Sequence, residues 1–211
     1  IAALPATGGE VVILDGTYNI TARINVNKDN VSIRGNGNAT ILKRMWNSSS
    51  LDGVITLTSV EGCRVENLQI DGNKATYTAS YNCGIYLDSS SNNIITGNTC
   101  NNSNYSGIYL YSSSNNTVTG NICNNNNHNN GIRLSLSSND NTVTGNTCNN
   151  NNSSGIYLDS SSNNAVTGNT CNNNNSGIYL YSSSNNTVTG NTCIRGTGQP
   201  SDYTSSQYTI R

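Results

Sequence analysis

Short segments in which apolar and polar residues alternate recur through the second half of the chain. In Ile108-Tyr109-Leu110, for example, two apolar residues flank a tyrosine with a polar tip. Because successive side chains of a strand point to opposite faces, this pattern predicts strands with Ile and Leu inward and Tyr outward. Five such segments, each opened by a glycine, are Gly84–Leu87, Gly107–Leu110, Gly131–Leu134, Gly155–Leu158 and Gly177–Leu180.

The spacing of these segments indicates the fold. Their glycines stand 22 to 24 residues apart, and each segment is followed by a Ser/Asn turn and a second motif that ends in cysteine, such as Val118–Cys123. A repeat of this length with short strands and no helical period is too short for a propeller blade and fits one turn of a solenoid. Successive turns would pair in parallel about 4.8 Å apart. We therefore predict an all-β fold, a single-stranded right-handed parallel β-helix of about nine coils.

Stacking of the coils explains why the sequence is so repetitive. Equivalent residues of successive coils would lie above one another in columns. Asparagine suits the turns, because it tolerates left-handed backbone and its amide can bond the amide in the next coil. The predicted asparagine columns are Asn93, Asn116, Asn141, Asn164 and Asn186, and Asn98, Asn121, Asn146, Asn169 and Asn191.

We expect the whole chain, 1–211, to form a single domain. Residues 1–83 would make irregular N-terminal coils, 84–193 five regular coils, and 194–211 a truncated C-terminal coil. In the irregular part, Ile70 takes the position that cysteine has in later coils. The chain opens at Ile1 without a methionine or signal peptide, and its end, Tyr208–Arg211, looks like a strand cut off mid-pattern, so we expect a processed or trimmed piece of a longer protein. Neither end has an obvious cap, which would favour end-to-end stacking.

The composition is polar but almost uncharged. Only 10% of the residues are charged and the net charge is -1, so attraction to nucleic acid or to an anionic membrane surface is weak. No run approaches the roughly 18 apolar residues of a membrane helix. We therefore expect no nucleic-acid partner and no membrane insertion.

Two sets of residues resemble known β-helix proteins. Leu4–Val12, Gly16–Tyr18 and Ile33–Gly37 look like the first turns of pectate-lyase-like proteins. The later Ser-Asn-Asn-x-Val-Thr-Gly-Asn repeats resemble the parallel β-helix repeats of carbohydrate-binding and sugar-hydrolase domains in surface proteins and phage tail spikes. The resemblance covers nearly the whole chain and implies an extracellular, cell-surface or phage-tail location. It leaves the activity open, since this fold carries lyases, hydrolases, epimerases, adhesins and passive fibres.

One cysteine recurs at an inward position of five consecutive coils. A tetrahedral metal site needs ligands around a point, whereas these thiols would lie along a line, and the one histidine, His128, falls in an Asn-rich loop. Buried thiols act as small hydrophobic groups, although the expected Cα spacing also permits disulfides between adjacent coils. We expect no metal and no cofactor, and a structural core containing Cys100, Cys123, Cys148, Cys171 and Cys193.

The outward face of the Gly-Ile-Tyr-Leu strand presents aromatic rings on successive coils. Stacked phenol rings make a flat platform on which sugar rings can lie, and their hydroxyls can hydrogen-bond to the sugar. The alternative is that tyrosine simply favours strands and stabilises the sheet by cross-strand stacking. The predicted glycan-binding residues are Tyr86, Tyr109, Tyr111, Tyr157, Tyr179 and Tyr181.

The carboxylates of the regular coils do not form a catalytic pair. Glycoside hydrolysis uses two carboxylates about 5–9.5 Å apart, whereas Asp88 and Asp159 would stand three coils apart, about 14 Å. Arg133 and Asp159 lie on adjacent coils, where they would form a salt bridge or one half of a lyase site. We expect no enzyme, with Asp88, Arg133 and Asp159 as the candidate catalytic residues if there is one.

Together these observations favour an extracellular structural or adhesive β-helix. Its tyrosine face would bind a polysaccharide or cell-surface glycan, and its rods would self-associate end to end or side by side, because bare edge strands recruit other strands. The alternative is a polysaccharide lyase or glycoside hydrolase with acids from the early coils, where Glu61, Glu66 and Asp71 are close in sequence.

Overall fold

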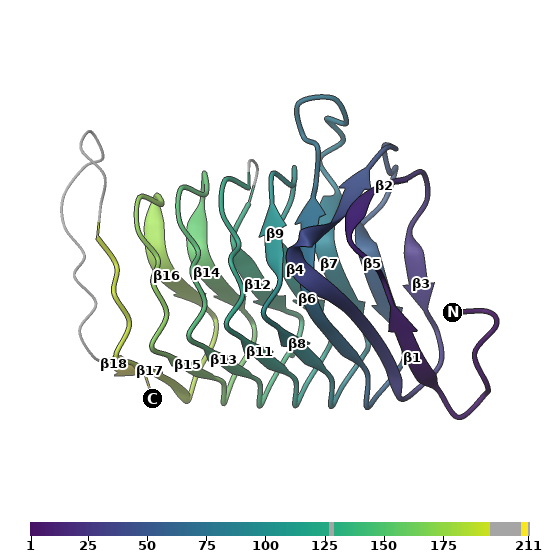
Figure 1. Cartoon of the computed structure of the whole chain (residues 1–211). Helices are drawn as coiled ribbons and strands as arrows, with labels where there is room; N and C mark the ends of the chain where they lie inside the picture. Colours follow the sequence, from purple (N-terminus) through teal and green to yellow (C-terminus); the bar gives the residue numbers. More distant parts are fainter. Residues whose placement is uncertain (127–128, 195–207, 211) are drawn as a thin grey trace.

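The computed structural model describes residues 1–126, 129–194 and 208–210, which wind into an elongated coil of short strands (Figure 1). The strands of this part of the chain form two sheets, and no helix occurs among them. Accordingly, the described residues contain no helical segment that could cross a membrane.

The longer sheet, called sheet A, receives one strand from each coil, and from β1 to β17 all of its pairings are parallel. Its strands, in spatial order, are β1 (Gly9–Val12), β4 (Val31–Arg44), β6 (Arg64–Asp71), β8 (Ile94–Thr96), β11 (Thr117–Thr119), β13 (Thr142–Thr144), β15 (Ala165–Thr167) and β17 (Asn186–Thr189). Further along each coil, β2 (Gly16–Ile20) pairs with the end of β4 and β9 (Thr99–Asn101) with the end of β6.

The shorter sheet, called sheet B, forms another side of the coil and is parallel throughout. Its strands, in spatial order, are β16 (Ser176–Tyr181), β14 (Ser154–Asp159), β12 (Ile132–Ser135), β10 (Ile108–Tyr111), β7 (Asn82–Asp88), β5 (Asp52–Thr58) and β3 (Ile24–Val26). The parallel β-helix predicted from the repeat is confirmed.

The described residues make eight coils, because eight strands follow one another in sheet A from β1 to β17. We predicted about nine from the 22- to 24-residue spacing of the later coils, and fewer are found because the early coils are longer. Ser32 pairs with Arg64 and Arg64 with Ile94, which places 32 and 30 residues in these coils. The later coil from Ala165 to Thr187 takes 22. The extra residues lie in the connections after β4 and after β6.

The core is a continuous apolar interior in which equivalent residues stack. Ile85, Ile108 and Ile132 are in register on neighbouring strands and have no exposed surface. The five cysteines of the regular coils belong to the same core cluster. All seven cysteines of the chain lie in the described part, and none forms a disulfide. Ile70 pairs with Cys100 and so begins the column that the cysteines continue.

Buried asparagines connect the turns from coil to coil. The backbone N–H of Asn98 donates to Oδ1 of Asn121 (3.0 Å), and Nδ2 of Asn121 donates to the carbonyl of Ile95 (2.9 Å) and to Oδ1 of Asn146 (3.0 Å). Gly120 precedes Asn121 with a φ of 64°, in the left-handed region that glycine adopts without strain. The same bonding recurs along the other buried column, Asn93, Asn116, Asn141, Asn164 and Asn186.

The C-terminal end differs from the expected truncated coil. β18 (Tyr208–Ile210) pairs with β17, but antiparallel, so it runs back along sheet A and does not continue the winding. Most of the expected coil, 195–207, together with residue 211, lies outside the described residues.

Candidate functional site

The outer face of sheet B carries the predicted tyrosines in two columns. Cα register places Tyr86, Tyr109, Arg133, Tyr157 and Tyr179 in the first column. The second column contains Asp88, Tyr111, Ser135, Asp159 and Tyr181. The order of the side chains is therefore the one that the period-two pattern predicted.

Exposure, however, divides the face into two halves. Tyr86 and Tyr109 are only 6% and 3% exposed and pack with Cys83, Leu51 and Tyr105. Their rings are tilted by 35°, with centroids 5.5 Å apart, and do not form a flat stack. The expectation of six exposed platform rings is therefore wrong for these two tyrosines.

Connections between the strands account for this burial. Leu51 lies in the connection between β4 and β5, and Tyr105 in the one between β9 and β10. Figure 1 shows the connection between β6 and β7 projecting beyond the coils beside this half of sheet B. The unusual length of the early coils was the signal in the sequence that could have revealed this cover.

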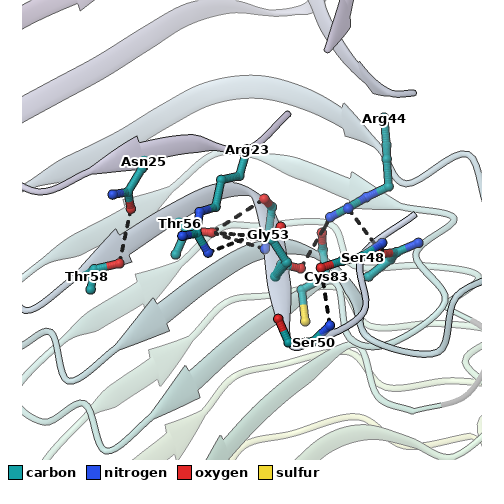
Figure 2. Close-up of polar contacts among 11 residues, drawn as sticks. Arg23, Asn25, Arg44, Ser48, Ser50, Gly53, Thr56, Thr58 and Cys83 are labelled. Carbon is teal, nitrogen blue, oxygen red and sulfur yellow. Dashed lines mark hydrogen bonds and ion pairs between the residues drawn. The ribbon is translucent and has the colours of Figure 1, made fainter. Parts of the chain in front are cut away.

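A buried arginine, which sequence reasoning missed, fixes these connections. Arg44 has no exposed surface, and its guanidinium donates to Oδ1 of Asn82 (3.2 Å) and to the carbonyls of Asp52 (3.3 Å) and Cys83 (2.8 Å) (Figure 2). It also lies 3.9 Å from the ring centre of Trp46, and burial lowers its pKa to about 10. Arg44 follows buried Leu42 by two positions in the same strand. Because strand side chains alternate between the two faces, this spacing places Arg44 inward.

The other half of the face is open. Tyr157 and Tyr179 stack with centroids 5.3 Å apart and ring planes 9° from parallel. Tyr179 and Tyr181 are 47% and 54% exposed. On this half two of the rings stack on each other and Tyr179 and Tyr181 are accessible, so the outward, stacked tyrosines that the sequence predicted are present here.

Arg133 lies at the boundary between the two halves. Its guanidinium donates to the Tyr105 hydroxyl (2.8 Å) and to Oδ2 of Asp159 (3.1 Å), so the predicted ion pair with Asp159 is present. It also lies 5.3 Å and 5.1 Å from the ring centres of Tyr109 and Tyr157. Its Nε is buried and has no hydrogen-bond partner. A fixed cation and a carboxylate therefore border the exposed rings.

The remaining candidate acids are dispersed. Asp88 lies three strands from Asp159 in its column and accepts a bond from the Ser89 hydroxyl (3.1 Å). Glu66 pairs with Arg64 (3.2 Å). Asp71 accepts bonds from the Asn73 N–H and the Asn102 amide. Nowhere in the described ranges do three or more His, Cys, Asp or Glu side chains converge in a group able to hold a metal ion.

One groove outside sheet B contains two carboxylates. It has a volume of about 310 Å³ and is lined by Asp29, Glu61, Ser59, Val60, Ser89 and Ser91. The backbone N–H of Glu61 donates to the Asp29 carboxylate (2.9 Å), which places the two acids on adjacent coils. Glu61 was named from the sequence as an early acid, whereas Asp29 was not.

The buried tyrosines make stability depend on alkaline pH. Burial raises the pKa of Tyr109 to about 12, from an ordinary value of 10.0. Below pH 10 both the folded and the unfolded chain hold this proton, but between pH 10 and 12 only the folded chain does. We therefore expect the free energy of unfolding to fall by about 2 kcal/mol over this window.

Chemical denaturation at several alkaline pH values measures this loss. Tyr109→Phe cannot ionise and should flatten the slope between pH 10 and 12. An unchanged slope in that variant would contradict the assignment.

Comparisons with known proteins agree with this architecture. A family model described as right-handed beta helix region matches residues 52–211. Comparison with curated protein sequences gives no match.

Several solved structures share the fold. ORF18 of Geobacillus virus E2 matches 88% of this chain with a TM-score of 0.70 at 18% identity, over 46% of its own length. The Dettilon tailspike protein gp208 matches 79% with a TM-score of 0.61 at 22% identity, over 37% of its length. The catalytic domain of a GH87 α-1,3-glucanase, in complex with nigerose, matches 85% with a TM-score of 0.57 at 14% identity, over 41% of its length.

The chain spans less than half the length of each of these three structures, and the identities are low, so the likeness concerns the fold. The family match, in contrast, extends over most of the sequence and over every regular coil described above. The chain therefore belongs to the right-handed β-helix family.

Proposed function

We propose that this chain is the rod of an extracellular, cell-surface or phage-tail adhesive protein that binds a glycan on the open half of sheet B. The binding surface comprises Tyr157, Tyr179 and Tyr181, with Arg133 and Asp159 beside them. Tyr111 lies at the margin of this surface.

The stacked pair Tyr157–Tyr179, in which Tyr179 is the exposed ring, carries the proposal. Tyr179 stacks on Tyr157 with one ring face and is 47% exposed, so its other face can receive the apolar C–H face of a pyranose ring. Strands hold the rings, so little side-chain entropy is lost when a sugar docks. Tyr181, on the same strand as Tyr179, extends the surface.

The polar neighbours can orient the sugar. Arg133 is held by Tyr105 and Asp159, and the Asp159 carboxylate keeps acceptor capacity for a sugar hydroxyl. In sugar sites, a few fixed polar groups beside an apolar surface give orientation and specificity.

The structural neighbours support this proposal at the level of the fold. One is named a tailspike protein, and another is a glucanase domain in complex with nigerose. A coil of this kind therefore occurs in a phage-tail protein and in a protein that binds a carbohydrate.

A glycan array tests the function directly. One class of oligosaccharide on the array should bind the purified chain. Incubation of the chain with that oligosaccharide should release no shortened or unsaturated product. If the chain binds none of the neutral, acidic or amino-sugar glycans, the proposal of glycan binding is contradicted. Formation of a product would favour an enzyme.

Self-association of the rods is part of this proposal. β3 and β16 lie at the two edges of sheet B and, within the described residues, have a strand partner on one side only. Edge strands with free backbone groups pair with other chains. We expect the mass measured by light scattering to rise with protein concentration, and a constant monomer mass would contradict it.

The groove at Asp29 and Glu61 favours one alternative, a glycoside hydrolase. Two carboxylates on adjacent coils border a space large enough for a sugar ring. If products do appear on the array, Asp29→Asn and Glu61→Gln should abolish them while Asp159→Asn leaves them unchanged. The reverse pattern would move the catalytic site to sheet B.

A further inference from the structure

Five thiols follow one another through the core of the regular coils: Cys100, Cys123, Cys148, Cys171 and Cys193, here called the cysteine column. The backbone N–H of Cys123 donates to the carbonyl of Thr147 in the next coil (2.7 Å), and Cys100, Cys148 and Cys171 make equivalent 2.7 Å bonds. Neighbouring cysteines are therefore one strand spacing apart, about 4.8 Å. Cys123 therefore lies between Cys100 and Cys148 along the column.

The column lies in a dry and uncharged environment. Cys100, Cys123 and Cys148 have no exposed surface. Burial raises the pKa of Cys123 and Cys148 well above the ordinary thiol value, so these thiols keep their protons. Glycines pack tightly against the cysteines: a Cβ on Gly177 would lie 2.5 Å from Sγ of Cys193, and one on Gly131 would lie 2.7 Å from Cβ of Cys148. Any larger residue at these positions would therefore collide with the column.

A linear arrangement excludes a tetrahedral metal but suits an ion with two opposite ligands. Soft thiolates select soft cations such as Cu(I), and a metal–thiolate bond is about 2.3 Å, the length known for zinc. Two opposite bonds then span about 4.6 Å, close to the roughly 4.8 Å between coils. Since each thiol points inward across the coil axis, a metal between two sulfurs lies along the column, nearly perpendicular to the Cβ–Sγ bonds.

We propose that the cysteine column is a linear binding site for soft monovalent cations, each held between the sulfurs of two adjacent coils. This site is independent of the glycan surface, which lies on the outer face of sheet B. It uses none of the residues proposed there.

Charge balance makes the uptake compatible with a dry core. One cation replaces the proton of one thiol, forming a metal–sulfur bond as the S–H bond breaks and the proton leaves to water. A lone pair of the neighbouring sulfur supplies the second bond. The interior therefore gains no net charge, which avoids the large cost of burying an ion alone. The lone pairs of one sulfur do not point in opposite directions along the column, so each thiol takes part in one bridge. The five thiols therefore hold at most two cations, which displace two protons.

The column is accessible at one end. Cys193 is 9% exposed, and a cavity of about 20 Å³ is lined by Cys171, Cys193, Gly177 and their neighbours. This volume holds one water-sized guest. The opposite end is closed, because Ile70 pairs with Cys100. Cations would enter between Cys171 and Cys193 and move inward from gap to gap.

Titration of the purified full chain with Ag⁺, followed by native mass spectrometry, tests the site. We expect up to two silver ions per chain, an unchanged far-UV circular dichroism spectrum and a higher Tm. The variant Cys171→Ala/Cys193→Ala retains three column thiols and should bind at most one ion. The matched control Cys63→Ala/Cys83→Ala leaves the column intact and should still bind two.

Equal stoichiometry in the two double variants, or loss of the β spectrum on binding, would overturn the proposal. X-ray absorption of the silver-loaded wild type decides the case even if a variant fails to fold. Two sulfur neighbours per silver support the linear site, whereas three or more ligands, or nitrogen and oxygen ligands, refute it.

Discussion

Replacement of Asn121 by alanine is expected to lower the free energy of unfolding by roughly 3–5 kcal/mol. Asn121 is completely buried and joins three coils. Its removal leaves the backbone N–H of Asn98 without its acceptor and the carbonyl of Ile95 without its donor, whereas the Asn98 side-chain amide keeps its bond to the Val65 carbonyl. Each such buried group costs about 1–3 kcal/mol when no water replaces the partner.

Urea denaturation of the purified variant measures this loss. Asn175→Ala is the matched control, because Asn175 is exposed on a turn of a regular coil. The control should lie within about 0.5 kcal/mol of the wild type. Equal stabilities for the two variants would mean that the buried asparagines do not hold the coils together.

Replacement of Tyr179 by alanine is expected to weaken binding of the glycan selected on the array by tenfold to a hundredfold, about 1.4–2.8 kcal/mol. The substitution removes the exposed ring of the stacked pair and leaves Tyr157 without its partner. Tyr181→Ala should give a smaller loss, because no ring stacks on Tyr181 in the described structure.

Titration calorimetry with the selected oligosaccharide measures both variants. Tyr179→Phe keeps the ring and should recover most of the affinity. Tyr18, which is 37% exposed on β2 and remote from sheet B, provides the control, and Tyr18→Ala should bind as the wild type does. If Tyr18→Ala and Tyr179→Ala lose equal affinity, the sugar does not lie on the stacked rings.

The regular coils could be predicted in detail because equivalent residues of successive coils occupy the same environment. The repeats of the sequence, aligned with one another, predict the pairing of Ile108 with Ile132 and of Ile70 with Cys100. The same alignment placed Arg133 beside Asp159, and the structure has this ion pair. The alternation within each strand and the spacing between repeats can both be read from the sequence. In a stacked coil they determine which side chains are in contact.

The cover over Tyr86 and Tyr109 could not be predicted in this way. It depends on the connections between β4 and β5 and between β6 and β7, on Tyr105 between β9 and β10, and on Arg44, which reaches Asn82 across 38 positions. Periodicity indicates that a residue points outward but not whether another segment lies on top of it. The open half of the face remains because the described connections between β14 and β17 are short.

A crystal structure of the chain with the selected oligosaccharide most directly tests the proposal that the stacked tyrosines bind the glycan. We predict that a pyranose ring packs against the exposed ring of Tyr179, with a hydroxyl hydrogen-bonded to Asp159 or Arg133. A sugar bound instead in the groove between Asp29 and Glu61, with the open half of sheet B unoccupied, would contradict it.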